Sequence, residues 1–153
     1  MVAANPETVP PAYPAPVLAA AVLAAQDVSF LLVGSAALWL HGELVTVADA
    51  DAVIDPREPN LSRLGAALAA MGRRPRAIPR VRDFPLLHLV SVDTCYGRID
   101  CLLERGRLDW DRLSGSSARI PVADVSVPVA NLADTWALRR RFKDGAGSRS
   151  ECL

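Results

Sequence analysis

The chain has 153 residues, 51% of them hydrophobic, and its 17 basic and 17 acidic residues give a formal net charge of zero. This length suits one domain with a substantial core, and the hydrophobic content excludes a mainly disordered chain. The balanced charge excludes a global field that would draw the protein to nucleic acid or to a membrane. The cysteines argue against a disulfide framework or a zinc site, because they are odd in number and lack a C-x-x-C spacing: Cys95, Cys101 and Cys152. We therefore expect a cytoplasmic protein.

Residues 1–15 are rich in proline and predict a mobile tail. Residues 16–144 form the expected domain, and residues 145–153 a flexible C-terminal tail. The alanine- and leucine-rich stretch from Val17 to Gln26 predicts a helix. Its apolar part is too short to span a bilayer, and no basic region precedes it, so we expect neither membrane association nor a signal peptide.

The next stretch, 29–54, predicts a strand, a tight turn at Gly34-Ser35, a short helix and a second strand. We expect His41, at the end of that helix, to hydrogen-bond the carbonyls of the helix end. The free backbone N–H groups where the chain enters the helix favour a phosphate. Gly34 lets the backbone approach such a group closely, and Ser35 adds a hydroxyl donor.

The second strand carries Asp49 and Asp51, which share one face because side chains alternate along a strand. Two adjacent carboxylates repel each other, and an isolated buried charge is costly. A divalent cation removes both problems, and Mg²⁺ is commonly held by one or two carboxylates together with substrate phosphates. A metal pair beside a phosphate-binding turn indicates phosphoryl or nucleotidyl transfer.

Asn60 is expected to cap a helix over 61–71. An arginine-rich loop, 73–82, follows. It could neutralise a triphosphate or hold a polynucleotide backbone, or it could simply reflect a GC-rich genome. The stretches 86–92 and 98–103 predict an antiparallel hairpin, whose second strand carries Asp100. Asp100 is the candidate for a third carboxylate, with Asp93 as the alternative.

Two brief strands, around 120–122 and 125–129, precede a last helix that starts near Asn131. Arg139 in that helix is a candidate for neutralising a triphosphate.

The spacing hydrophobic-Gly-Ser, thirteen residues (36–48), then Asp-x-Asp resembles the signature of the DNA polymerase β-like nucleotidyltransferase superfamily. The closest resemblance is to the small bacterial enzymes of the AbiEii-like and minimal nucleotidyltransferase groups, several of them toxins or antitoxins. The segment 96–100, YGRID, is similar to the strand that brings in the family's third carboxylate. The segment 127–138, VPVANLADTWAL, looks like the strand and helix that close these domains, and 141–144 resembles the Arg-x-Lys-Asp that follows.

The resemblance implies an α/β (α+β) minimal nucleotidyltransferase fold, a mixed sheet of about five strands with helices packed mainly on one side. It also implies transfer of an NMP from a nucleoside triphosphate to a hydroxyl of a protein, a tRNA end or a small molecule, in a toxin–antitoxin setting. The catalytic and metal-binding residues would be Asp49, Asp51 and Asp100, holding Mg²⁺ or Mn²⁺. The triphosphate would be bound by Gly34, Ser35 and Arg139.

The chain also departs from the family pattern. Val47 stands where a Thr or Ser is usual, and Arg139 where a lysine is usual. No helical second domain follows, so we expect either a partner protein from an adjacent gene or a second copy of the chain to supply the missing contacts. The alternative is a catalytically degenerate binding module that acts as a regulatory or antitoxin-like partner.

Overall fold

The computed structural model describes residues 12–103 and 108–145. The strands are β1 (Phe30–Val33), β2 (Asp49–Ile54), β3 (Leu89–Thr94), β4 (Gly97–Leu102), β5 (Ala118–Val122) and β6 (Val125–Val129). The α-helices are α1 (Ala15–Ala25), α2 (Gly34–Leu40), α3 (Asn60–Met71), α4 (Trp110–Gly115) and α5 (Leu132–Gly145). Two short 3₁₀ helices, η2 (Pro75–Ala77) and η3 (Val81–Leu86), connect α3 to β3. Most of the expected proline-rich tail and nearly all of the expected C-terminal tail lie outside the described residues.

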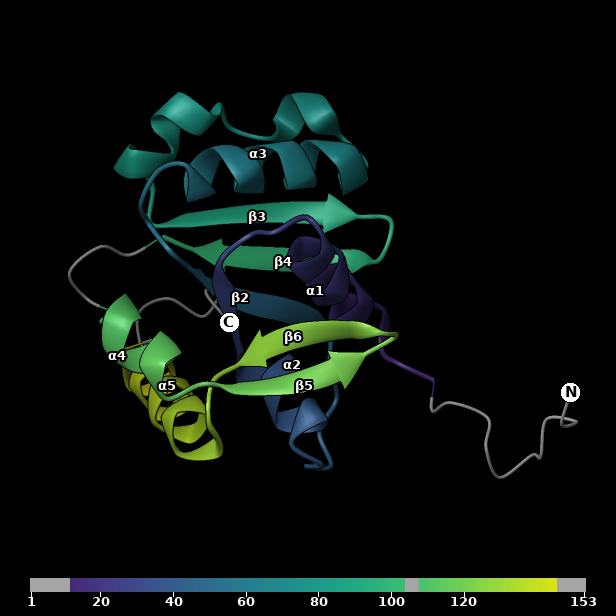
Figure 1. The fold of residues 1–153 in the computed structure, drawn as a ribbon, viewed down its shortest axis with the longest axis vertical. Coiled ribbons are helices and arrows are strands. Elements are labelled where there is room, and N and C mark those ends of the chain that lie inside the picture. The colour runs from purple at the N-terminus through teal and green to yellow at the C-terminus, as the bar shows by residue number, and fades with distance from the viewer. Residues whose placement is uncertain (1–11, 104–107, 146–153) are drawn as a thin grey trace, which may run out of the picture.

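The strands form one mixed sheet in the order β3-β4-β2-β1-β6-β5 (Figure 1). The β2–β4 and β1–β6 pairs are parallel, and the remaining neighbours are antiparallel. The mixed α/β sheet is therefore confirmed, with six strands where we expected about five. No helix in the described part of the chain is long and apolar enough to cross a membrane.

The two faces of the sheet are covered unequally. Alternate residues such as Leu32, Ala52 and Cys101 point to one face, where they join α1 and α3 in the larger core. Their neighbours Leu31 and Val53 point to the other face, into a smaller core made with α4 and α5. The same alternation places Asp49, Asp51 and Asp100 on the face with the smaller core. Most of the helical packing thus lies opposite the carboxylates.

We expected Asn60 to cap α3, but it is the first residue of that helix. Its buried side-chain amide donates to the carbonyl oxygens of Ser29 (2.8 Å) and Asp55 (2.9 Å), and its Oδ1 accepts from the Ser29 N–H (2.7 Å). A buried amide needs such partners because losing water without them is costly. Asn60 therefore ties the start of β1 to the end of β2.

His41 also makes a different contact from the one we expected. Its Nε2 lies 2.8 Å from the carbonyl oxygen of Ala130, which is 89 residues away, and not from a carbonyl of its own helix. His41 thus fixes the end of α2 against the junction between β6 and α5.

The last helix begins where we expected it. The Asn131 Oδ1 accepts from the Asp134 N–H at 2.7 Å, as an N-cap does.

The β3–β4 hairpin is confirmed, although its first strand is shifted to Leu89–Thr94. Its loop has two residues, Cys95 and Tyr96, and Gly97 supplies a positive φ of 98°. The Thr94 hydroxyl bridges the loop by donating to the Gly97 carbonyl (2.6 Å) and accepting from the Tyr96 N–H (3.0 Å). This turn fixes the register that brings Asp100 beside β2.

Candidate functional site

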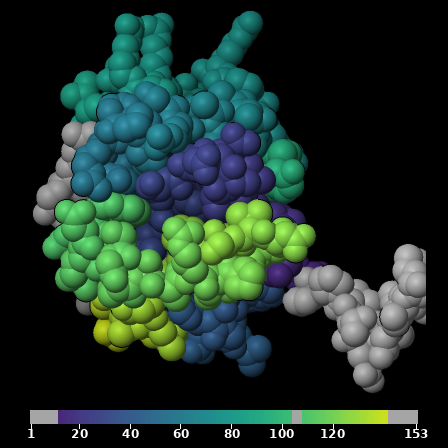
Figure 2. Space-filling view, viewed as in Figure 1, coloured from purple at the N-terminus to yellow at the C-terminus, as the bar shows by residue number. Residues whose placement is uncertain are grey.

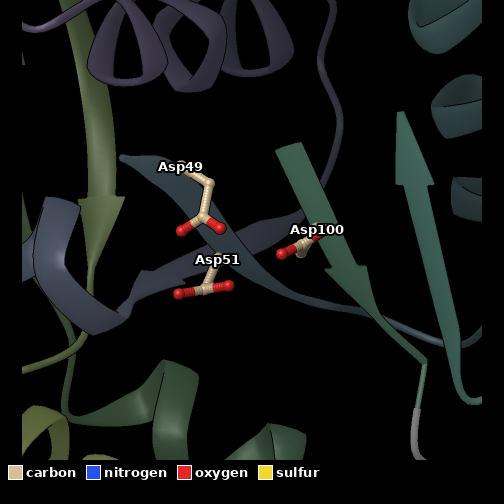
Figure 3. Close-up of side chains that lie close together, drawn as sticks. All are labelled: Asp49, Asp51 and Asp100. Atoms are coloured by element: carbon tan, nitrogen blue, oxygen red, sulfur yellow. The ribbon is translucent and has the colours of Figure 1, made fainter. Parts of the chain in front are cut away.

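Three carboxylates gather on one face of the sheet, from two neighbouring parallel strands. Asp49 and Asp51 lie two residues apart on β2, and Asp100 on β4 lies directly beside Asp51 in the strand register. One carboxylate oxygen from each residue lies within 4.8 Å of the others. Figure 3 shows the three side chains close together, Asp49 and Asp51 on one strand and Asp100 on the neighbouring strand. This arrangement can surround a small cation with oxygen ligands.

Asp93 was the alternative for the third carboxylate. In the described part of the chain, the cluster consists of Asp49, Asp51 and Asp100 and does not include it. It lies on β3, where it is exposed and faces Arg98 across the hairpin. The parallel pairing of β2 with β4 brings Asp100 next to Asp51, whereas β3 is separated from β2 by β4. The strand order therefore favours Asp100 on geometric grounds.

Asp51 is the most unusual of the three carboxylates. Its side chain is buried, and its Oδ1 has no hydrogen-bond partner within the described structure. Burial, followed by the charges of Asp49 and Asp100, raises the pKa of Asp51 to about 8. A buried polar atom without a partner is rare in proteins and calls for a ligand or another explanation.

Asp49 is less buried, and its pKa is also raised, first by burial and then by the charge of Asp100. The guanidinium of Arg98 acts in the opposite direction on both Asp49 and Asp51, and that of Arg139 on Asp51 alone. Burial and the mutual repulsion of the carboxylates thus outweigh the two guanidinium charges, so that without a cation Asp49 and Asp51 bind protons more readily than ordinary aspartates.

The third carboxylate is held by two residues to which the sequence interpretation gave no role. The Ser91 hydroxyl donates to the Asp100 Oδ1 at 2.5 Å, and the Arg98 Nε donates to the same oxygen at 3.0 Å. The Arg98 Nη2 also donates to the Ser91 hydroxyl at 3.2 Å. Arg98 could have been found from its position two residues before Asp100, which puts both on one face of a strand. Ser91 could not, because its contact depends on the hairpin register.

The turn at Gly34 lies against the Asp51 carboxylate. Gly34 has a φ of +68°, and a Cβ added there would overlap the Oδ2 of Asp51. Ser35, the next residue, is half-buried, and its hydroxyl makes no hydrogen bond to any residue that the structure describes. The turn therefore offers a close backbone approach and a hydroxyl at the edge of the carboxylate cluster.

Arg139 comes to the same region from α5. It is half-buried, and its charge lowers the pKa of Asp51, which places its guanidinium within electrostatic reach of the cluster. All six residues named as candidates from the sequence thus lie on or beside this face.

The donor set fits a hard divalent cation. Carboxylate oxygens are the ligands that Mg²⁺ and Mn²⁺ prefer. A cation bound here would give the buried Oδ1 of Asp51 a partner and would offset the burial and repulsion that raise the pKa values of Asp49 and Asp51. Asp49, Asp51 and Asp100 are the residues that would hold the ion.

No protein-family model matches the chain, and no curated protein matches it. Among solved structures, a Thermotoga maritima protein described as a candidate nucleotidyltransferase matches with a TM-score of 0.56 and 15% sequence identity. The match covers 80% of this chain and 81% of that one. At this identity the likeness shows the fold alone. The chain therefore shares its fold with a nucleotidyltransferase-like protein.

Proposed function

We propose that this protein is a metal-dependent nucleotidyltransferase that moves an NMP from a nucleoside triphosphate to an acceptor hydroxyl. The observation that carries the proposal is the three-carboxylate cluster, in which a buried oxygen of Asp51 lacks any described partner. The shared fold supports it. The sequence resemblance to AbiEii-like and minimal nucleotidyltransferases supports a toxin–antitoxin setting.

In the proposed reaction the acceptor oxygen bonds to the α-phosphorus, and the bond from that phosphorus to the β-phosphate's bridging oxygen breaks, releasing pyrophosphate. Bound Mg²⁺ or Mn²⁺ would stabilise the charge that builds on the attacking and leaving oxygens. Asp49, Asp51 and Asp100 would hold the cation. Asp100 would orient the acceptor hydroxyl and receive its proton, with its own orientation set by Ser91 and Arg98.

The triphosphate would lie along the turn beside Asp51. Gly34 would let the backbone of the turn approach a phosphate, Ser35 would contribute a hydroxyl that bonds to no residue the structure describes, and Arg139 would neutralise phosphate charge. These three residues extend the carboxylate cluster towards α2 and α5. This position beside the cluster supports the proposal that they bind a triphosphate whose phosphate also contacts the metal ion.

The test is transfer of label from each α-labelled triphosphate, with Mg²⁺ or Mn²⁺, to the protein itself, to total tRNA, or to the product of the adjacent gene. Asp51→Asn should abolish the transfer, because losing a metal ligand costs several kcal/mol of transition-state stabilisation. Asp93→Asn is the matched control, an aspartate outside the cluster, and should leave the rate nearly unchanged. If Asp93→Asn abolishes transfer and Asp100→Asn does not, the third carboxylate is Asp93.

The absence of transfer to any acceptor, together with a tight complex with the neighbouring gene's product, would instead support the degenerate binding module. A second copy of this chain is the other candidate partner, and the mass of the complex in solution distinguishes the two.

A further inference from the structure

One segment of the surface concentrates positive charge in a chain whose net charge is zero. The segment 73–82 contains five exposed arginines: Arg73, Arg74, Arg76, Arg80 and Arg82. Within the described residues, none of their guanidinium groups makes a hydrogen bond or an ion pair. By contrast, Arg57, Arg98 and Arg112 each pair with a carboxylate. We call the five residues the arginine surface.

The arginine surface is built on a packed base. Phe84 is buried, and Ile78 and Val81 pack against the larger core. Val81 fits against Gly65 of α3, where even a Cβ would overlap its side chain. The apolar residues of the segment thus anchor it to α3, and the arginines are left to face solvent. Figure 2 shows long side chains of this teal segment projecting from the body of the molecule.

The arginine surface is anchored on the face of the sheet opposite the carboxylates, but one end of it, Arg73, reaches the outer strand of the sheet. The Arg73 N–H donates to the Asp93 carbonyl at 2.9 Å, which places it beside the outer strand β3. Asp93 faces Arg98 on β4, and Arg98 in turn faces Asp49 on β2. Because neighbouring strands lie about 4.8 Å apart, three such steps put the backbone of Arg73 roughly 15 Å from that of Asp49. An extended ligand on the arginine surface could therefore reach the cluster over the edge of the sheet.

We propose that the arginine surface binds the phosphodiester backbone of a single-stranded nucleic acid, whose terminal hydroxyl is the acceptor. Binding of the strand does not depend on the proposed function. The role of its terminal hydroxyl as the acceptor rests on the proposed function. Arginine presents a planar fork of donors that matches phosphate, and backbone contacts of this kind position a strand without reading its sequence. The segment 73–82 contains no aromatic residue, and aromatic side chains are the usual anchors of a protein in a lipid headgroup layer.

The test is fluorescence anisotropy with labelled single-stranded RNA and DNA of one sequence, without nucleoside triphosphate, over a range of salt concentrations. The double variant Arg76→Gln/Arg80→Gln should bind more weakly than the parent. Its slope of log K against log salt concentration should fall by about 1.4, since each phosphate contact to a single strand contributes about 0.7. The comparison of RNA with DNA tells which backbone is preferred.

The matched control is Arg119→Gln/Arg140→Gln, which removes two exposed arginines that likewise lack partners in the described structure but lie on β5 and α5. It should leave affinity and slope almost unchanged. Equal losses in both variants, or binding to phosphatidylserine vesicles but not to either strand, would overturn the proposal. If the protein transfers label to a protein but binds neither strand, this inference is wrong and the proposed function stands. If it binds a strand but transfers no label to any acceptor, strand binding is confirmed and the proposed function is wrong.

Discussion

The α-carbon of Gly34 lies so close to the Asp51 carboxylate that a Cβ added to the glycine would overlap the Oδ2 of the aspartate. The turn that opens α2 and the buried carboxylate of β2 are therefore one structural unit. Gly34 is needed both for its positive φ and for the space that it leaves. The spacing between Gly-Ser and Asp-x-Asp in the sequence reflects this direct contact.

Gly34→Ala should separate the two requirements when it is compared with Gly42→Ala. Both glycines have positive φ (+68° and +92°), but nothing lies within 4 Å of a Cβ at Gly42. We expect Gly42→Ala to cost about 1 kcal/mol of unfolding free energy from backbone strain alone. Gly34→Ala should cost more and should also abolish the Mg²⁺-dependent rise in melting temperature, because it displaces Asp51. An intact Mg²⁺ shift in Gly34→Ala would contradict this account.

The stability of the metal-free protein should fall as pH rises from about 4 to 8. The folded pKa of Asp51 is raised to about 8, well above the ordinary 3.8, so the native state binds more protons than the unfolded chain in this window. The contribution is complete below pH 4 and is lost as pH rises through 8, with a slope of at most about 1.4 kcal/mol per pH unit. Urea denaturation in EDTA at several pH values measures it.

The same titration in Asp51→Asn should be flatter, and saturating Mg²⁺ should reduce the decline in the parent. A metal-free protein that becomes more stable between pH 5 and pH 8 would show that Asp51 is not buried as described.

Replacing a buried aspartate of β2, Asp51, and the buried aspartate just after it, Asp55, by asparagine should change stability in opposite directions. Asp51 has an unpartnered oxygen, whereas Asp55 accepts from the Nε of Arg57 at 2.9 Å and from its Nη2 at 3.1 Å. Without metal, Asp51→Asn should be as stable as the parent or more so, because it removes a carboxyl whose ionisation is opposed by burial and by the charges of Asp49 and Asp100. Asp55→Asn should be less stable than the parent, because it loses its ion pair with Arg57. Thermal denaturation in EDTA measures both, and the ranking is contradicted if Asp51→Asn is the less stable variant.

The sequence predicts those parts of the site that depend on local spacing. The two-residue period of a strand places Asp49 and Asp51 on one face, and the hairpin pattern places Asp100 on a strand. It does not predict the contacts of Asn60 and His41, whose partners lie 31 and 89 residues away, respectively, and are brought close only by the folded sheet. The Ser91–Asp100 contact is missed for a related reason, since it follows from the two-residue loop that sets the register of β3 against β4.

Ser91→Ala should lower the turnover of the proposed transfer reaction about tenfold, which corresponds to about 1.4 kcal/mol, the value of a hydrogen bond to a charged group. Its hydroxyl orients Asp100, which acts on the acceptor, so the Michaelis constant for the triphosphate should change little. Ser91→Thr keeps a hydroxyl on the same strand position and should restore most of the turnover. Equal activity of the alanine and threonine variants would show that the hydroxyl does not position Asp100.

Arg139→Gln should raise the Michaelis constant for the triphosphate more than it lowers turnover. Its charge acts on Asp51 from α5, beside the proposed phosphate site, so it should contribute to ground-state binding and to the transition state alike. Arg140→Gln is the matched control, because Arg140 is the next residue of the same helix but is exposed. Steady-state kinetics with the labelled triphosphate separate the two constants. If turnover falls while the Michaelis constant stays fixed, Arg139 acts on the charge that develops only in the transition state, and its assignment to triphosphate binding is wrong.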